Sequence, residues 1–460
     1  MERSSGGFSP NSLEEHWMPF TNNREFKSEP RLIVKSEGMY HWDHKGGKIL
    51  DGSSALFNVA CGHARKEIAD AVHKQLLTND YSAPFQMGHP GSFALAKEVA
   101  KLTPEGMDHV FFTNSGSESI DTALKMAMAY HGARGDHKRH RFVSRERAYH
   151  GVNIGGVSLS GMIRNRESFP GVMPYVALMR HTHIPENKFQ RGQGEHGGVE
   201  LANDLERIAM TYGPGTIAAC FVEPIAGSTG CLVPPRGYLE RLREICDKHG
   251  ILLVFDEVIT GFGRLGHPFA AQAFGVKPDI MTLAKAITNG SQPMGAVVVR
   301  DEIYETLTEK AAPGMIEFFH GYTYSGHPAA CAAGLATMEI YRKEKLFEKA
   351  AKLSPYFLDK LWSLKSLDIV TDIRGYGMFG AVDVKAGKAP GTRGNELQKK
   401  LFWNGCHIKF TGDTGIVEVR AVTARLRRAC SGQDEPVQHV HGHRTDRCHS
   451  QSMQTSRHFA

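Results

Sequence analysis

ILLVFDEVITGFGRLG (residues 251–266), followed after a short connection by KPDIMTLAKAITNG (residues 277–290), decides the fold. Its first apolar run ends in two carboxylates, Asp256 and Glu257, and its second ends one residue before Lys285. Apolar runs of about four to eight residues without alternation are typical of strands covered on both faces of a parallel sheet. Open sheets of this kind carry their chemistry just beyond the carboxyl ends of the strands. The sequence therefore predicts that an acid and an amine face one crevice.

This pair of groups suits pyridoxal phosphate. That cofactor needs a lysine amine to hold its aldehyde as a Schiff base, and an acid that keeps its ring nitrogen protonated so that the ring can accept electrons. Lys285 and Asp256 are the candidates for these two roles. A structural ion pair between two strand ends is the alternative interpretation, and the spacing alone does not distinguish the two.

The composition favours a soluble globular protein with room for two domains. The chain has 460 residues, of which 41% are hydrophobic and 23% charged, which is ordinary for a folded protein. No apolar stretch reaches the roughly 18 residues of a membrane span, and the polar start resembles neither a secretory signal nor a transit peptide. A cytoplasmic location without membrane attachment is expected. The net charge of +6 is small for this length, and no basic stripe indicates a nucleic-acid partner.

Cysteine and histidine usage gives no indication of a metal centre. Eight cysteines are scattered without a CxxC pair, so buried thiols of a reducing compartment are expected, with no metal bound. The polar, Gly-rich stretch 185–198 is interpreted as a surface insertion. The histidines in and near it are expected to be solvated and not to act as ligands; they are His181, His183 and His196.

A second motif, TNSGSES at residues 113–119, lies between an apolar strand and an amphipathic helix. Small residues in such a turn let backbone amides approach an anion, and the start of the helix adds the positive end of its dipole. The motif thus predicts a phosphate-binding turn at Gly116 and Ser117. A helix capped by Ser117 without any ligand is the alternative.

Strands and helices alternate through the middle of the chain. The expected strands include 109–112, 141–144, 217–222, 251–255 and 280–283. This alternation predicts an α/β fold with a doubly wound, mainly parallel sheet. Hairpin signals before residue 90 and strand pairs after residue 367 predict a small α+β domain made from both chain ends.

Four segments follow from these patterns. Residues 1–90 hold an N-terminal segment and the first part of the small domain, and residues 91–320 form the large cofactor-binding domain. Residues 321–417 supply interdomain helices and the C-terminal part of the small domain. Residues 418–460, with five His and seven Arg, form an atypical tail that is not expected to follow the pattern of a folded domain.

The assembled motifs resemble those of the class III pyridoxal-phosphate-dependent aminotransferases of fold type I. The sequence is most similar to the ω-amino acid (β-alanine) to pyruvate transaminases, over about residues 13 to 417. The motifs that carry the resemblance are HWMPFT, FFTNSGSES, YHG, VEPIAGSTG, FDEVITGFGR, LAKAITNG and GYTYSGHP. Several spaced motifs in one order make a chance match very improbable.

The resemblance implies roles for the groups around the cofactor ring. Lys285 would form the internal aldimine and move the proton, and Asp256 would pair with the pyridinium nitrogen. Tyr149 would stack on one ring face and Val258 would pack on the other. Glu223 would stand beside the ring hydroxyl.

The resemblance also implies a shared active site. The amides of Gly116 and Ser117 would hold the phosphate, with help from Thr323 contributed by a partner subunit. The relatives are homodimers or homotetramers whose sites lie at the subunit interface.

Aromatic residues are expected to line the substrate pocket. Phe20, Phe57 and Phe85 match such positions, and Phe57 stands where relatives often carry Trp. Trp17 lies in the same aromatic loop as Phe20 and either pins that loop or lines the pocket. Lys409 occupies the position at which relatives use Arg to clamp a carboxylate, and a lysine supplies a point charge instead of a bidentate fork.

The expected reaction is a ping-pong transamination. An ω-amino acid or amine such as β-alanine would pass its amino group to the cofactor, giving pyridoxamine phosphate, and a keto acid such as pyruvate would then accept it. Two alternatives stay open: another reaction of this cofactor, such as that of an aminomutase or a decarboxylase, and an impaired relative that acts as a binding protein. A nicotinamide enzyme is disfavoured because no GxGxxG follows an early strand. The identity of the donor is left open.

Overall fold

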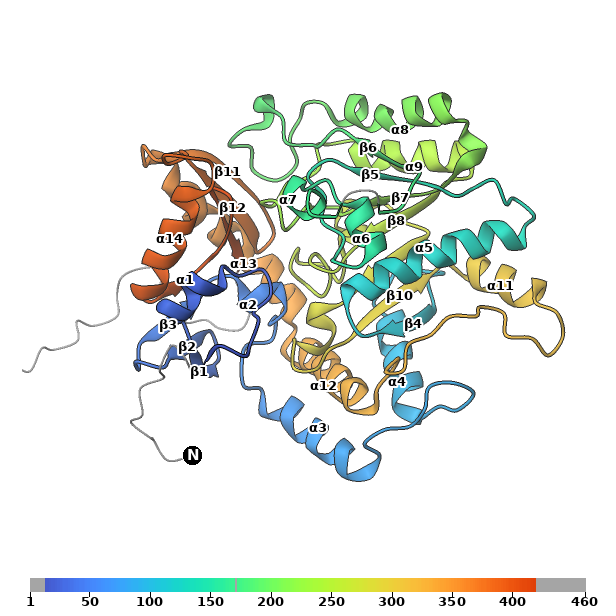
Figure 1. Ribbon diagram of the computed structural model, residues 1–460, viewed down its shortest axis with the longest axis horizontal. Coiled ribbons are helices and arrows are strands. Elements are labelled where there is room, and N and C mark those ends of the chain that lie inside the picture. The colour runs from blue at the N-terminus through green and yellow to red at the C-terminus, as the bar shows by residue number, and fades with distance from the viewer. Residues whose placement is uncertain (1–12, 170–171, 419–460) are drawn as a thin grey trace, which may run out of the picture. The chain divides into compact units, whose positions relative to one another are not determined.

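A seven-stranded sheet forms the centre of the protein. The computed structural model describes residues 13–169 and 172–418, and its large sheet has the strand order β4-β10-β9-β8-β7-β5-β6 (Figure 1). The strands are β4 (His109–Thr113), β5 (Arg141–Arg145), β6 (Val176–Met179), β7 (Ile217–Val222), β8 (Leu252–Asp256), β9 (Ile280–Leu283) and β10 (Gly295–Val299). Strand β10 pairs antiparallel with β4 and β9, and the other neighbouring strands of this sheet pair in parallel. The predicted, mainly parallel sheet is confirmed.

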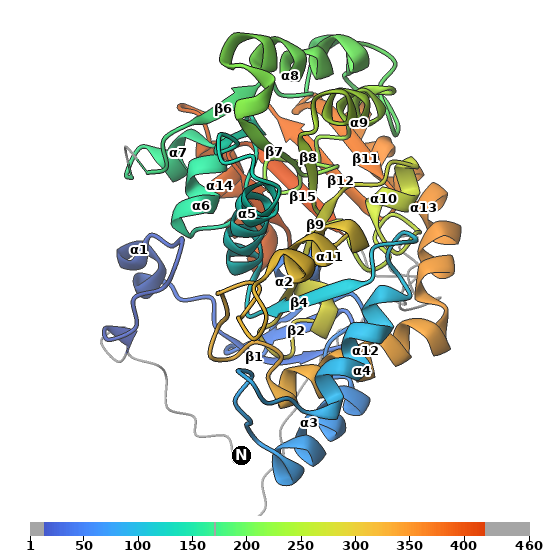
Figure 2. The ribbon, with the colours of Figure 1, turned by 90° about the vertical axis from the view of Figure 1, so that its right-hand side faces the viewer.

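Helices cover both faces of this sheet. Along β8, Leu253 and Phe255 pack into the core that contains α8 (Gly198–Tyr212) and α9 (Tyr238–His249). Their neighbours Leu252 and Val254 belong to the opposite core, which is built on α5 (Gly116–Ala133). Figure 2 shows α5 on one side of β7 and β8 and α9 on the other. Burial on both faces explains why these strands are apolar without alternation.

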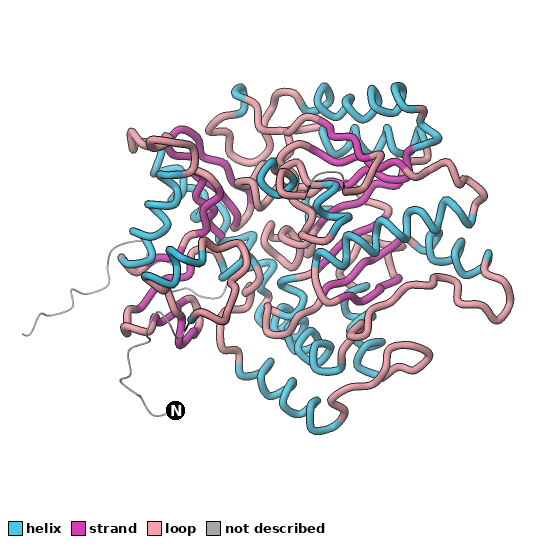
Figure 3. Tube along the Cα trace, in the orientation of Figure 1, coloured by secondary structure: helices cyan, strands magenta, loops and turns pink. Residues whose placement is uncertain are grey.

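Two four-stranded sheets combine the two ends of the described chain (Figure 3). One has the order β1-β2-β3-β13 and the other β11-β12-β15-β14. Their strands are β1 (Ile33–Glu37), β2 (Tyr40–Asp43), β3 (Lys48–Asp51), β11 (Val370–Tyr376), β12 (Phe379–Val384), β13 (Cys406–His407), β14 (Lys409–Thr411) and β15 (Thr414–Glu418). Parallel pairing of Cys406 with Leu50 closes the first sheet, and Ser53 Oγ donates to the Ile416 carbonyl at 2.7 Å. The predicted small domain from both chain ends is confirmed.

The remaining helices connect and cover these sheets. They are α1 (Asn23–Ser28), α2 (Ser54–Phe57), α3 (Lys66–Thr78), α4 (Pro90–Ala100), α6 (Ile154–Leu159), α7 (Ile163–Arg166), α10 (Ala270–Phe274), α11 (Asp301–Lys310), α12 (Pro328–Glu344), α13 (Leu346–Trp362) and α14 (Thr392–Trp403). Short 3-10 helices are η2 (Pro185–Asn187), η3 (Pro214–Thr216), η4 (Lys285–Thr288) and η5 (Ser363–Ser366). None of the helices in the described ranges combines the length and apolar character that a membrane span needs. The segment boundaries at residues 90 and 320 stay predictions, and the tail lies outside the described residues except for Glu418.

Candidate active site

The ends of β8 and β9 bring an acid and an amine to one cavity. These strands are parallel neighbours with Asp256 paired to Thr282, so Asp256 and Lys285 emerge at the same edge of the sheet. The cavity has a volume of about 100 Å³. Its lining consists of Gly116, Ser117, Tyr149, His150, Gly151, Glu223, Asp256, Val258, Ile259 and Lys285.

Lys285 is suited to act as a nucleophile. Burial lowers the pKa of its ammonium group, and the nearby Asp256 charge opposes this effect only in part. The neutral amine, which is the nucleophilic form, is thereby favoured. Lys285 also adopts a left-handed backbone with φ of +50° at the start of η4, a conformation that costs a residue with a side chain about 1–2 kcal/mol. Such strain is typical of functional sites.

A buried histidine fixes the orientation of Asp256. His150 Nδ1 donates to Asp256 Oδ2 at 2.8 Å, and the Val258 amide donates to Asp256 Oδ1 at 3.1 Å. His150 is 1% exposed, and within the described ranges its Nε2 atom has no hydrogen-bond partner. His150 is thus the buried hydrogen-bond partner of the Asp256 carboxylate.

The turn before α5 is open to an anion. Ser115, and not Ser117, caps this helix, because its Oγ accepts the Glu118 amide at 3.2 Å. The amides of Gly116 and Ser117 donate to no protein acceptor among the described residues. A Cβ atom on Gly116 would lie 3.1 Å from the Val258 side chain. The glycine thus keeps the backbone open to a ligand, as a phosphate site requires.

Gly151 gives a direct test of this turn. Its φ is +96°, and an added Cβ would lie 2.5 Å from Ser117 Oγ and 2.8 Å from Ser117 Cα. G151A is therefore expected to displace Ser117 and to raise the dissociation constant for pyridoxal phosphate at least about tenfold. Titration of the apoprotein, followed by absorbance, measures this constant.

G135A is the matched control for G151A. Gly135 has a similar φ of +80° but no atom within 4 Å of an added Cβ. It should lower the free energy of unfolding by about 1 kcal/mol through backbone strain alone and leave the dissociation constant unchanged. Equal dissociation constants for G151A and G135A would contradict the assignment of the turn.

Glu223 holds the loop that carries Tyr149. Its Oε1 accepts the Tyr149 amide and its Oε2 accepts the Gly227 amide, both at 2.9 Å. Burial raises the pKa of the Glu223 carboxyl group. Arg145 Nη2 in turn donates to the Glu223 carbonyl at 2.8 Å. Tyr149 and Glu223 thus reach the cavity as one hydrogen-bonded unit.

The aromatic candidates for the substrate pocket do not meet at this cavity within one chain. Phe57 is buried and packs edge-on against Phe379 at a ring distance of 6.1 Å, in a core that also includes the cavity residue Ile259. Three other candidates are exposed, with exposed fractions of 87%, 77% and 55% for Trp17, Phe20 and Phe85. Their roles in a substrate pocket stay predictions.

Thr323 and Lys409 also lie outside the cavity lining. Thr323 is exposed, and its carbonyl accepts the Tyr81 hydroxyl at 3.0 Å. Phe85 packs close to Gly321 in the same loop, so Phe85 and Thr323 share one exposed surface. Lys409 lies on β14, where burial lowers the pKa of its ammonium group; within the described ranges its side chain forms no ion pair.

Two buried charges of the motif FDEVITGFGR were missed as functional candidates. Burial raises the pKa of Glu257 to about 7, although Thr260 Oγ1 and two backbone amides of α10 donate to its carboxylate. Arg264 Nε lies 2.5 Å from Glu418 Oε1, and its Nη2 donates to the Phe57 carbonyl. Arg264 therefore ties the cavity loop to the pocket candidate Phe57. The sequence could have indicated both residues, because Glu257 and Arg264 lie inside the motif FDEVITGFGR.

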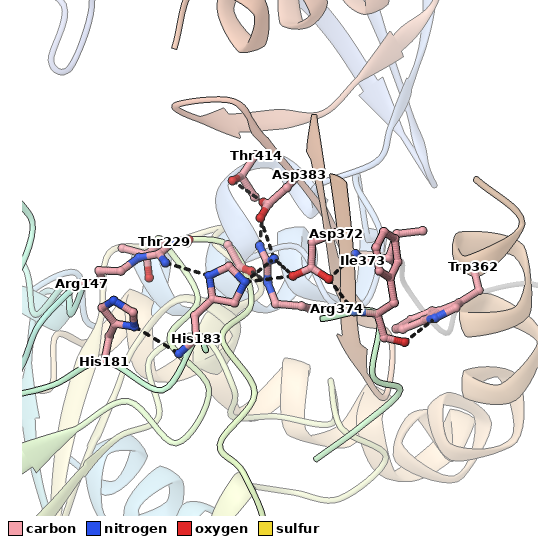
Figure 4. Close-up of polar contacts among 12 residues, drawn as sticks. Arg147, His181, His183, Thr229, Trp362, Asp372, Ile373, Arg374, Asp383 and Thr414 are labelled. Atoms are coloured by element: carbon pink, nitrogen blue, oxygen red, sulfur yellow. Dashed lines mark hydrogen bonds and ion pairs between the residues drawn. The ribbon is translucent and has the colours of Figure 1, made fainter. Parts of the chain in front are cut away.

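The expectation of solvated histidines was wrong for His183. Its side chain is only 16% exposed and lies in a cluster of charged groups with Asp372 and Arg374 (Figure 4). The partners come from strand β11, which is almost 190 residues distant along the chain. A polar stretch of sequence carries no signal of a contact so far away.

The cavity offers a lysine amine whose pKa is lowered by burial, an oriented carboxylate and, within the described ranges, a turn with unpaired backbone amides. These groups fit pyridoxal phosphate, which presents an aldehyde, a basic ring nitrogen and a phosphate. The model of the family "Aminotransferase class-III" matches residues 21–425. The chain belongs to the class-III aminotransferases. It is therefore a transferase that uses pyridoxal phosphate, and the recognition from sequence motifs is confirmed.

Named relatives among the class-III aminotransferases support this assignment. The chain is 49% identical over 408 residues to "Omega-aminotransferase" of Caulobacter vibrioides, which covers 88% of this chain and 92% of that protein. It is 49% identical over 405 residues to "Beta-alanine--pyruvate aminotransferase" of Pseudomonas aeruginosa, with coverages of 88% and 90%. The solved ω-transaminase from Pseudomonas jessenii in complex with PMP has a TM-score of 0.87 at 31% identity and covers 93% of this chain and 96% of its own.

Proposed function

We propose that this aminotransferase moves the amino group of an ω-amino acid such as β-alanine to pyruvate. The observation that carries the proposal is the single cavity in which Lys285 and Asp256 lie beside the turn of Gly116 and Ser117. The printed names of the two relatives at 49% identity support the donor class and the keto acid. The amine exchange needs a nucleophilic amine and a proton carrier, and Lys285 supplies both.

Lys285 would hold the cofactor through its Nζ atom, at the aldehyde carbon. When bound, pyridoxal phosphate supplies an electron sink that makes the donor C–H bond acidic. The Lys285 amine, whose pKa is lowered by burial, would accept this proton and donate it again during the amino-group exchange. Its position at the edge between β8 and β9 keeps the proton transfer inside the cavity.

The other cavity residues would hold and orient the cofactor ring. Asp256, aligned by His150 Nδ1, would keep a proton on the ring nitrogen. Tyr149 would stack on the ring and Val258 would pack against its other face, while Glu223 would stand on the ring hydroxyl side and fixes the Tyr149 backbone. The negative charge of Asp256 would favour the protonated, electron-accepting state of the ring.

The anion site would be completed by a second copy of the chain. We include in the proposal a homodimer or homotetramer with shared sites, in which Gly116 and Ser117 of one subunit and Thr323 of its partner bind the phosphate. Thr323 and Phe85 lie on one exposed surface and do not line the cavity of the same chain, which supports this arrangement.

A cytoplasmic location is also proposed. The described residues include five buried free thiols, which are typical of a reducing compartment.

Subunit complementation tests the shared site. T323D places a negative charge beside the phosphate, so K285A and T323D should each be nearly inactive as homodimers. In an equal mixture after subunit exchange, half of the dimers carry one intact site, and about a quarter of wild-type activity should return. A mixture that stays inactive, although mixed dimers are detected by native mass spectrometry, would contradict the shared site.

The absorption spectrum of the holoenzyme tests the proposed function. The wild-type protein should show a band near about 410–430 nm that shifts to about 330 nm with β-alanine and returns with pyruvate. A product formed from the donor without any keto acid would indicate an aminomutase or a decarboxylase. A band that no amine shifts would leave a binding protein as the better assignment.

Lys409 provides a test of keto-acid recognition. We propose that Lys409 binds the substrate carboxylate as a point charge, and that K409R adds a second, parallel hydrogen bond. The KM for pyruvate should then fall about fivefold, while the KM for an uncharged amine donor stays the same. Steady-state kinetics of the two half-reactions separate these constants. A parallel change in both KM values would show that Lys409 only shapes the fold.

A further inference from the structure

A cluster of charged groups joins the small sheet to the loops of the cofactor cavity (Figure 4). Arg374 of β11 donates to both carboxylate oxygens of Asp383 at 2.7 Å and to Asp372 at 2.5 Å. Its Nε donates to the Gly230 carbonyl at 3.0 Å, in the loop that begins at Glu223. The guanidinium thus already fills the place that a metal cation would take among His183, Asp372 and Asp383.

His183 lies between this cluster and Arg147. Its Nε2 is 2.9 Å from Asp372 Oδ2, and its Nδ1 is 2.9 Å from Arg147 Nη1. A guanidinium only donates hydrogen bonds, so Nδ1 must accept from Arg147. His183 is therefore neutral, with its single proton on Nε2 directed at Asp372. Arg374 Nη1, 3.1 Å from Nε2, directs its own protons to the carboxylates.

Arg147 has few other partners to hold it in place. Among the described residues its guanidinium forms no ion pair; its second contact is a 3.4 Å hydrogen bond to the Thr229 carbonyl. Its backbone is left-handed, with φ of +59°, which is a strained conformation for a residue with a side chain. The turn that carries this strain is followed two residues later by Tyr149, whose ring lines the cofactor cavity. The hydrogen bonds of Arg147 to His183 and Thr229 hold this strained turn in place, and they thereby help to fix the position of Tyr149.

We propose that neutral His183 is a positioning residue for the cofactor site, acting through Arg147 on the Tyr149 loop, and that Asp372 selects the tautomer that makes this possible. The proposal rests on the proposed stacking of Tyr149. A second proton on Nδ1 would remove the acceptor for Arg147 and place a cation beside two guanidinium groups. The charged or titratable groups that face His183 are Arg147, His181, Asp372, Arg374 and Asp383.

Two amide variants test the roles of the two His183 ring nitrogens separately. In H183N the carboxamide oxygen takes the place of Nδ1 and can accept from Arg147 at any pH. In H183Q the carboxamide reaches the place of Nε2, beside Asp372, and leaves Arg147 without its acceptor. At pH 8 the dissociation constant for pyridoxal phosphate should stay within about twofold of wild type in H183N and rise about tenfold in H183Q, equal to about 1.4 kcal/mol. Titration of the apoproteins by absorbance measures it.

H196Q, at an exposed histidine, is the control and should bind pyridoxal phosphate as the wild type does. Equal dissociation constants for H183N and H183Q at pH 8 would overturn the proposal. If H183Q does not fold, as judged by thermal unfolding of the apoprotein, R147M replaces it. A methionine has no donor for His183 Nδ1 and should give the same tenfold weakening. Y149A reports on the proposed function separately. If Y149A binds the cofactor normally, the role of Tyr149 fails, whatever the His183 variants show.

Discussion

K285A is expected to lower turnover by at least about a thousandfold, because it removes both the nucleophile and the proton carrier of the exchange. Nothing else in the described cavity lining can take over these roles, since Lys285 is its only amine. Initial rates with β-alanine and pyruvate measure the loss. A second readout is independent of turnover: reduction with borohydride should attach the cofactor to wild-type Lys285 and leave K285A unlabelled in intact-mass spectra.

K138A controls for the loss of a lysine charge. Lys138 is exposed between α5 and β5, and its removal should change neither rate nor labelling. If K285A keeps more than a few per cent of the wild-type rate, Lys285 is not the essential amine. Labelling of K285A at another lysine would lead to the same conclusion.

D256N is expected to lower turnover at least about a hundredfold with little change in the fold. The carboxamide keeps the size of the side chain and an acceptor for His150 Nδ1, but it loses the negative charge that keeps a proton on the ring nitrogen. The half-reaction with β-alanine, followed by stopped-flow absorbance, should slow by the same factor as turnover. Cofactor binding should weaken far less, since the turn at Gly116 and Ser117 is untouched.

D247N is the matched control, because Asp247 is an exposed aspartate on α9 that pairs only with Arg243. It should retain the wild-type rate. A D256N variant whose half-reaction runs at more than a tenth of the wild-type rate would show that the ring nitrogen does not depend on this carboxylate.

The parts of the site that lie at strand ends could be predicted from the sequence. Asp256 and Lys285 each follow an apolar run that is buried on both faces, so the same physical pattern marks the strand and its end. Gly116 could be predicted for a related reason, because a turn of small residues before a helix is a local feature. Local patterns and the order of strands along the chain were enough for the fold class.

Contacts between distant segments could not be predicted in this way. His183 meets Asp372 across almost 190 residues, and Arg264 meets Glu418 through a buried ion pair. Neither partner changes the local pattern of the other, so a single sequence holds no signal for the pairing. The exposed positions of Phe20 and Phe85 show a second limit, because in the proposed dimer a partner subunit would complete their pocket.

The closure of the first small sheet has a consequence for biosynthesis. Strand β3 is paired on one side by β2, but its other edge pairs with β13, and Ser53 bonds to a carbonyl 363 residues later. At about 5–20 residues per second, a ribosome needs roughly 20 to 70 s to make the intervening chain. During that time the three nascent strands β1, β2 and β3 leave one edge of β3 unpaired, and an unpaired edge can pair with other chains. Efficient production of this enzyme therefore depends on protection of one early strand edge until the last part of the fold has been synthesised.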